Sequence, residues 1–250
     1  GATTITSDDK GHAVSIAIPY GTYVVIESKT PHNMKTIKPF EVKIKENHPT
    51  EPQTWRIFLD REFTAKLRVI KKDSDTKQTV LVPNAEFKIF NLDKNEYVTQ
   101  YTTYPSKVKH TSFFTDEDGD LILPEALKIG NYRIEEIKAP FGYVVNDNYI
   151  NISVDTDTAF ETDGDTNDAI ITVEYSDAPA VGELTVEKKG EVLDGFKGGL
   201  FANSEDKEFV YKEGSLAGAV FKVYAAEDIF TADKQKDADG NRTKYYSKGD

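Results

Sequence analysis

A lysine and an aspartate stand where alternating strands would place apolar side chains. Lys71 follows Leu67 and Val69 at every second position, and Asp177 follows Tyr175 in the same way. Because alternate residues of a strand share one face, both charges point into the core if these faces are buried. An isolated buried charge is costly, so the two groups should be paired or neutral.

Glu136 supplies a third group for the same site. Burial disfavours the charged form of an amine and of a carboxyl group alike. A neutral amine is a nucleophile and a neutral carboxylic acid an electrophile, and a protonated glutamate between them would shuttle the proton and polarise the carbonyl. The product would be an amide between Lys71 and Asp177, formed with loss of one water. The alternative is an ordinary surface: a solvated lysine, an exposed glutamate and an aspartate at a strand end.

The segment that carries Glu136 occurs twice in the chain. In Gly130–Tyr143 and in Gly21–Pro31, a glycine, a tyrosine, apolar residues, a glutamate, a lysine and a proline recur in register. The turn at 115–119 repeats the turn at 7–11, and the alternating strand at 150–154 repeats that at 40–44. A repeat of this length predicts tandem β-domains.

A third copy of the plan begins after residue 180. Leu184–Lys189 repeats the strand around Lys71, and Leu216–Tyr224 repeats the strand at 82–90. The residues between them, around 194–212, are rich in glycine and charge and are expected to form an inserted loop. Alternation or β-branched and aromatic content predicts further strands at 12–18, 54–60 and 97–104.

The predicted layout is therefore half a domain, a whole domain and half a domain. Residues 1–63 carry a C-terminal half, 64–180 a complete domain, and 181–250 an N-terminal half. A lone half-sandwich exposes its core face and its strand edges, which is unfavourable. We expect the halves to complete each other, most simply head to tail between neighbouring copies. The alternative is a boundary that cuts a longer repeat array.

Four motifs in order resemble the Cna B-type (SpaA-like) repeat domain of Gram-positive surface adhesins and pilins. They are Leu-x-Val-x-Lys-Lys-Asp at 67–73, Asn-Ala-x-Phe at 84–87, Thr-Asp-x-x-Gly at 115–119, and Tyr-x-Ile-x-Glu-x-x-Ala-Pro-x-Gly-Tyr at 132–143. The resemblance implies an all-β, immunoglobulin-like or transthyretin-like sandwich with a spontaneous intramolecular isopeptide bond.

The same resemblance implies a role for each candidate residue. It makes Lys71 the donor, Glu136 the catalytic acid and Asp177 the acceptor, a position that is often asparagine in this family. In the split domain the matching positions are Lys188, Glu27 and Asp60. If these three come from different molecules, the same reaction would link chains.

Composition excludes several classes of function. The net charge of −12 lacks the basic footprint of a nucleic-acid-binding protein and is wrong for adhesion to anionic membranes. No apolar run approaches the roughly 18 residues of a membrane span. The absence of cysteine excludes disulfides and thiolate metal sites. The acidic loops at 163–168 and 237–241 lack the spacing of a calcium-binding EF-hand, so no metal or cofactor is predicted.

These observations favour a structural protein over an enzyme, because no arrangement for repeated turnover is visible. We expect a stalk or repeat region of a cell-wall-anchored, extracellular adhesin, with its signal and anchor outside this segment. Its expected partners are neighbouring repeats or copies of itself. The alternatives are a pilin shaft subunit or a module that binds a host matrix protein of the collagen type.

Overall fold

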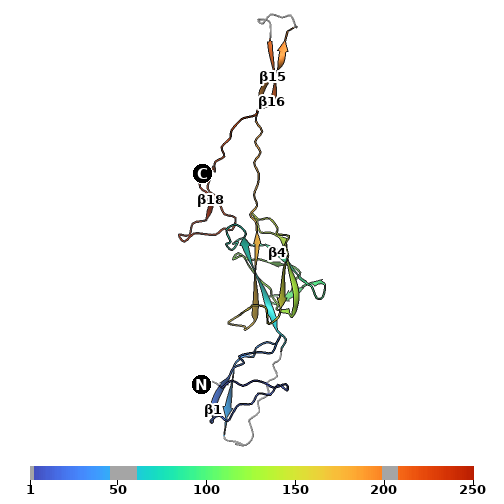
Figure 1. Cartoon of the computed structure of the whole chain (residues 1–250), viewed down its shortest axis with the longest axis vertical. Coiled ribbons are helices and arrows are strands. Elements are labelled where there is room, and N and C mark those ends of the chain that lie inside the picture. Colours follow the sequence, from blue (N-terminus) through green and yellow to red (C-terminus); the bar gives the residue numbers. More distant parts are fainter. Residues whose placement is uncertain (1–2, 46–60, 199–207) are drawn as a thin grey trace.

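A computed structural model describes residues 3–45, 61–198 and 208–250 of the chain. The described residues form strands, turns and extended segments, and none of them forms a helix that could cross a membrane. The molecule is elongated, with the N-terminal strands at one end, a two-sheet body in the middle and a long hairpin at the other end (Figure 1). The expected all-β class is confirmed.

The central body is a sandwich of two five-stranded sheets. One sheet contains β3 (Thr64–Asp73), β9 (Asp120–Ile122), β10 (Leu127–Lys128), β13 (Glu161–Thr162) and β14 (Ala169–Asp177). The other contains β4 (Glu86–Asn91), β5 (Glu96–Tyr97), β8 (Phe113–Phe114), β11 (Gly130–Lys138) and β12 (Ile150–Val154). A separate hairpin joins β6 (Gln100–Thr102) to β7 (Val108–His110).

Alternation along β3 builds one wall of the core. Every second residue from Ala65 to Asp73 is buried, and Leu67 and Val69 belong to the main apolar cluster. Phe87 on β4 and Ile134 on β11 meet them from the opposite sheet. The predicted parity is therefore confirmed, and it carries Lys71 into the core together with its apolar neighbours.

The first and last strands of the sandwich lie side by side and run parallel. β3 pairs with β14 along its length, with Lys71 opposite Tyr175 and Asp73 opposite Asp177. Asp177 lies two residues after Tyr175, the partner of Lys71, and alternate residues of a strand share a face. This register therefore puts Lys71 and Asp177 on the same side of the sheet, at diagonal positions.

The N-terminal part repeats one hairpin of the sandwich. β1 (Gly21–Val25) pairs antiparallel with β2 (Phe40–Ile44), beginning with Gly21 opposite Ile44. β11 pairs with β12 in the same register, beginning with Gly130 opposite Val154. The sequence repeat is thus a repeat of strand pairing.

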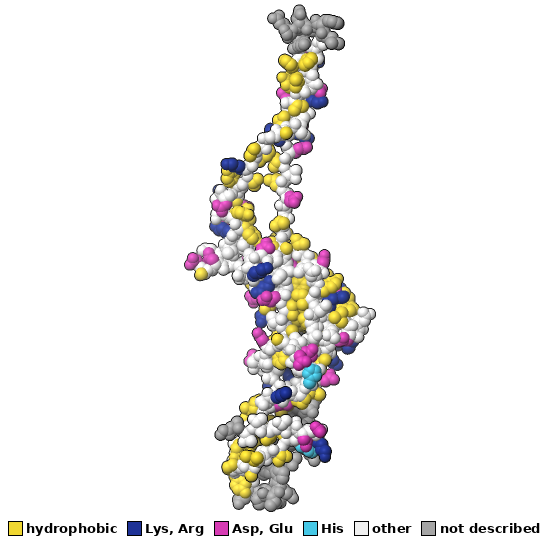
Figure 2. Space-filling view, in the orientation of Figure 1, with side chains coloured by type: hydrophobic (Ala, Val, Ile, Leu, Met, Phe, Trp, Pro, Cys, Tyr) yellow, Lys and Arg dark blue, Asp and Glu magenta, His cyan; other side chains and the backbone are white. Residues whose placement is uncertain are grey.

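Three predicted strands are not formed. Residues 12–18, 184–189 and 216–224 make no strand pairs with the described residues, apart from Lys189, which begins the long hairpin. β3 has paired neighbours on both sides, whereas these segments have none to complete their ladders. Leu184 is accordingly 70% exposed. Hydrophobic side chains lie on the surface at both ends of the molecule (Figure 2). The strand expected at 54–60 lies outside the described residues.

Two further expectations are corrected. The inserted segment is a hairpin rather than a loop: β15 (Lys189–Lys197) pairs with β16 (Glu208–Ser215). Cross-strand pairs such as Phe196 and Phe209 stabilise it despite its glycines and charges. The single strand predicted at 97–104 is divided between β5 and β6, which belong to different sheets.

The C-terminal residues return to contact the sandwich. Here β17 (Ile229–Phe230) and β18 (Lys244–Tyr246) pair as a short hairpin, and the residues between these two strands make the contact. Asp233 is buried there, accepting a hydrogen bond from the Thr76 hydroxyl (2.8 Å) through its side chain and from the Leu81 amide (2.9 Å) through its backbone. The contact covers the turn that follows β3.

Candidate functional site

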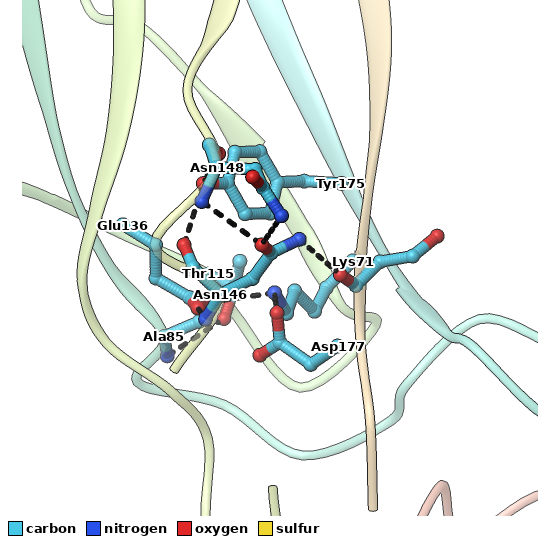
Figure 3. Close-up of polar contacts among 9 residues, drawn as sticks. Lys71, Ala85, Thr115, Glu136, Asn146, Asn148, Tyr175 and Asp177 are labelled. Carbon is cyan, nitrogen blue, oxygen red and sulfur yellow. Dashed lines mark hydrogen bonds and ion pairs between the residues drawn. The ribbon is translucent and has the colours of Figure 1, made fainter. Parts of the chain in front are cut away.

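Lys71, Glu136 and Asp177 meet in the core of the sandwich (Figure 3). The Lys71 ammonium nitrogen lies 2.7 Å from Glu136 Oε1 and forms an ion pair with Asp177 Oδ1. Lys71 has no exposed surface and Asp177 is 1% exposed. Three ionisable groups are therefore in direct contact without water around them.

Glu136 reaches the site from the sheet opposite to that of its two partners. It continues the inward face of β11 after Tyr132 and Ile134, and the pairing with β4 shifts register just after it. Its Oε2 atom accepts a hydrogen bond of 3.0 Å from the backbone amide of Asn146. Oε1 is thereby left to face Lys71.

The electrostatics of the site favour a neutral form of Asp177. Burial raises the pKa of Asp177 to about 7, Lys71 opposes this rise through its hydrogen bond and its charge, and Glu136 adds to it. Apart from the ion pairs, Lys71 Nζ, Glu136 Oε1 and both Asp177 oxygens have no hydrogen-bond partner among the described residues. Two carboxyl groups facing one ammonium can balance its charge only if one of them holds a proton.

Aromatic rings complete the enclosure around the lysine. The Lys71 nitrogen lies 4.6 Å from the centre of the Tyr175 ring and 5.6 Å from that of Phe87. The two rings meet edge to face at 5.1 Å. They exclude water from the amine, which strengthens every charge interaction in the site.

The arrangement supplies the components of an amide-forming reaction. An amine nitrogen contacts a carboxyl group whose pKa is raised to about 7, and a second carboxyl group is placed to move a proton between them. Water, which would solvate the charges and compete with the amine, is excluded. Structure brings together the three residues that the sequence singled out in the central domain.

The corresponding set of the split domain is not brought together. Glu27 keeps the same local contact, since its Oε2 accepts a hydrogen bond of 2.9 Å from the Ile37 amide, ten residues further on, as in the Glu136 site. Lys188, however, is exposed just before β15, and β15 lies at the end of the molecule opposite to β1 (Figure 1). Asp60 lies outside the described residues.

Two residues that contact the site, Asn146 and Tyr175, were not predicted from the sequence to belong to it. Asn146 lies in the loop between β11 and β12, where no periodicity marks it. Tyr175 was visible only as a residue on the face of Asp177. A sequence signal for Asn146 was absent, because its contacts depend on how the loop crosses the end of β14.

The family described as SpaA, prealbumin-like fold domain, matches residues 1–56 and 65–168, which is more than half of the chain. The chain belongs to the SpaA prealbumin-like domain family. This membership confirms the expected family and sandwich class, and it agrees with a structural protein rather than an enzyme. No curated protein sequence matches the chain significantly.

Several solved structures are distantly similar to this SpaA-family chain. The Bacillus anthracis TIE protein is 23% identical with a TM-score of 0.36, over 84% of this chain and 35% of that one. The group B streptococcus pilus 2b backbone protein is 19% identical with a TM-score of 0.37, over 62% and 52%. Shaft pilin spaA from Lactobacillus rhamnosus GG is 18% identical with a TM-score of 0.36, over 72% and 71%. The chain thus spans about a third of the first of these proteins and half of the second.

Proposed function

We propose that this chain is a structural stalk or shaft segment of an extracellular, cell-wall-anchored Gram-positive surface protein, whose central domain is closed by a Lys71–Asp177 isopeptide bond. The observation that carries the proposal is the fully buried contact of Lys71 with Asp177 and Glu136. A structural protein gains nothing obvious from burying three ionisable groups, whereas the crosslink consumes two of them. Family membership supports the same role.

The reaction balances without any co-reactant. A proton passes from the Lys71 ammonium to the carboxyl pair, which leaves a neutral amine beside the acid form of Asp177. The amine nitrogen attacks Asp177 Cγ while Glu136 hydrogen-bonds the carboxyl oxygen, and Glu136 then carries the second amine proton to the departing hydroxyl. The Cγ–O bond breaks, the Cγ–N bond forms and one water leaves. Glu136 ends in its acid form, holding the proton that the Lys71 ammonium gave up at the start.

The position of the bond suits a load-bearing segment. The chain enters the central domain at the start of β3, near Thr64, and leaves it at the end of β14, near Asp177. Because these strands are parallel neighbours, tension along the molecule pulls them in opposite directions. An amide from Lys71 to Asp177 carries that tension directly across the sheet, so the residues between them are not unfolded by it.

The test compares two glutamates that share a local structure. Glu136→Ala is expected to leave the fold intact and to restore the full mass that the wild-type protein lacks by one water. Glu27→Ala, the matched control, is expected to keep the deficit. A deficit that survives Glu136→Ala would refute the assigned role of this residue.

We propose further that residues 1–63 and 181–250 are complementary halves of the same kind of domain, completed between copies head to tail. Glu27 is held by its amide but has no lysine beside it among the described residues, and Lys188 is exposed in a segment that repeats the sequence around Lys71. A strand bearing Lys188 from a second copy would give Glu27 the neighbour it lacks.

The test of head-to-tail completion is a denaturing gel of the purified chain. Bands at multiples of the monomer mass are expected, and Lys188→Ala should remove them while Lys189→Ala, its neighbour, should not. A monomer band alone, together with monomeric behaviour in sedimentation, would refute completion between copies. Binding of a host matrix protein stays a prediction, since no described feature favours it.

A further inference from the structure

Asn146 uses all four of its polar groups next to the crosslinking site (Figure 3). Its backbone amide donates to Glu136 Oε2 at 3.0 Å, and its side-chain amide donates to the Ser176 carbonyl at 2.8 Å. Its own carbonyl accepts a hydrogen bond of 3.0 Å from the Tyr175 hydroxyl, and its Oδ1 accepts one of 3.0 Å from the Asn148 amide. One half-buried loop residue thus contacts both β11 and β14.

Three of these contacts lead to a reacting group. Glu136 is held through one oxygen, which leaves the other to face the lysine. Ser176 precedes the acceptor Asp177 in β14. The Tyr175 hydroxyl is held by the carbonyls of Asn146 and Asn148, at 3.0 and 2.5 Å, while its ring covers the Lys71 nitrogen. Asn146 therefore fixes the distance between the proton carrier and the strand of the acceptor.

The N-terminal repeat has the backbone contact of Asn146 without its side-chain contact. Ile37 occupies the position of Asn146 relative to the repeated glutamate, and its backbone amide makes the same bond to Glu27. Its aliphatic side chain has no donor for a neighbouring strand. The backbone contact therefore belongs to the repeated loop, whereas the side-chain contact to the last strand is added in the central domain.

We infer that Asn146 is a positioning residue for the isopeptide reaction, which clamps Glu136 to β14 and so sets the rate of bond formation. This inference rests on the proposed crosslink. The reaction needs three groups from two sheets in simultaneous contact, and a misplacement of about 1 Å can slow such a reaction by about 100-fold. The residue itself exchanges no proton with the reacting atoms.

The experiment follows the loss of one water by intact mass after dilution from denaturant of chain that was produced unfolded and has therefore not yet crosslinked. Asn146→Ile reproduces the N-terminal repeat, and Asn146→Asp removes the donor to Ser176 without changing the shape of the side chain. Both are expected to slow bond formation by about tenfold or more. Asn146→Gln keeps a side-chain amide and is expected to restore the rate to within about threefold of wild type.

Val144→Ala is the matched control, because it shortens an exposed side chain of the same loop and keeps the backbone amide that donates to the Ala178 carbonyl. It should leave the rate within about twofold. Wild-type rates in both Asn146→Ile and Asn146→Asp, or no recovery in Asn146→Gln, would overturn the positioning role while leaving the crosslink intact. A wild-type chain that never loses water would instead refute the proposed function itself.

Discussion

Glu136 and Glu27 stand on the same repeated hairpin, yet only Glu136 contacts a buried lysine that is paired with an aspartate. Both hairpins share their strand register, and both glutamates accept a hydrogen bond from the amide ten residues further on. Around Glu136 a second sheet supplies Lys71 and Asp177. Local sequence thus presents the carboxylate, whereas the sandwich brings it together with its proposed reaction partners.

The difference is visible in the apolar residues that flank each glutamate. Ile134, two residues before Glu136, is fully buried against the opposite sheet. Val25, its counterpart two residues before Glu27, is only half-buried. Burial is what disfavours the charged forms of an amine and a carboxyl group, so an uncovered hairpin cannot promote the reaction even with its glutamate in place.

The largest expected effect comes from the two lysines. Lys71→Ala leaves two buried carboxyl groups without their cation and should lower the free energy of unfolding by about 3–5 kcal/mol, besides preventing the crosslink. Lys188→Ala removes an exposed side chain and should change the free energy of unfolding by less than about 0.5 kcal/mol. Urea denaturation of the central domain measures both. Equal changes in the free energy of unfolding would contradict the claimed difference between the buried Lys71 and the exposed Lys188.

The equivalent leucines should differ nearly as much. Leu67→Ala opens a cavity in the main core and is expected to cost about 2–5 kcal/mol of unfolding free energy. Leu184 holds the same position in the third repeat but is mostly exposed in the single chain, so in dilute, monomeric protein Leu184→Ala should cost less than about 0.5 kcal/mol. Thermal unfolding monitored by circular dichroism checks the pair. A large loss at Leu184 would mean that a partner strand covers it.

The repeated turn glycines offer a smaller contrast. Gly119 and Gly11 have φ angles of 75° and 77°, so an alanine costs about 1–2 kcal/mol of backbone strain at either position. A Cβ on Gly119 would also lie 2.3 Å from the Val80 carbonyl oxygen, whereas one on Gly11 meets nothing within 4 Å. Gly119→Ala should therefore be clearly the more destabilising in urea denaturation. Equal midpoints would contradict this close packing.

The smallest expected effect is on the pH dependence of crosslinking. The raised pKa of Asp177, about 7, keeps its acid form abundant below pH 7 and depletes it above. Since the acid form is the electrophile, bond formation should be slower at pH 8 than at pH 6, by up to about tenfold. Asp177→Asn replaces the titrating acceptor by an amide, so it should lose this dependence while releasing ammonia. Time courses by intact mass measure both.

Much of the central domain followed from sequence alone. Strict alternation in β3 placed Lys71 among core residues, and the repeated motif located Glu136. The same alternation at 184–189 predicted a strand that is not formed, because a strand also needs neighbours to pair with. Periodicity reports which face a residue would occupy and says nothing of whether a partner is present.

Contacts between distant loops and strands were the part that sequence did not reveal. Asn146 acts through the Ser176 carbonyl, 30 residues away, and Asp233 through the Thr76 hydroxyl, 157 residues away. Neither residue belongs to a periodic segment. Such contacts depend on how finished elements dock, which a local pattern cannot encode.

The most direct test of the central claim is the intact mass of the purified chain, followed by peptide mapping. The account predicts a mass one water below that of the sequence, and a branched peptide in which Lys71 is joined to Asp177. A chain of full mass, with both residues recovered in separate unmodified peptides after folding, would contradict it.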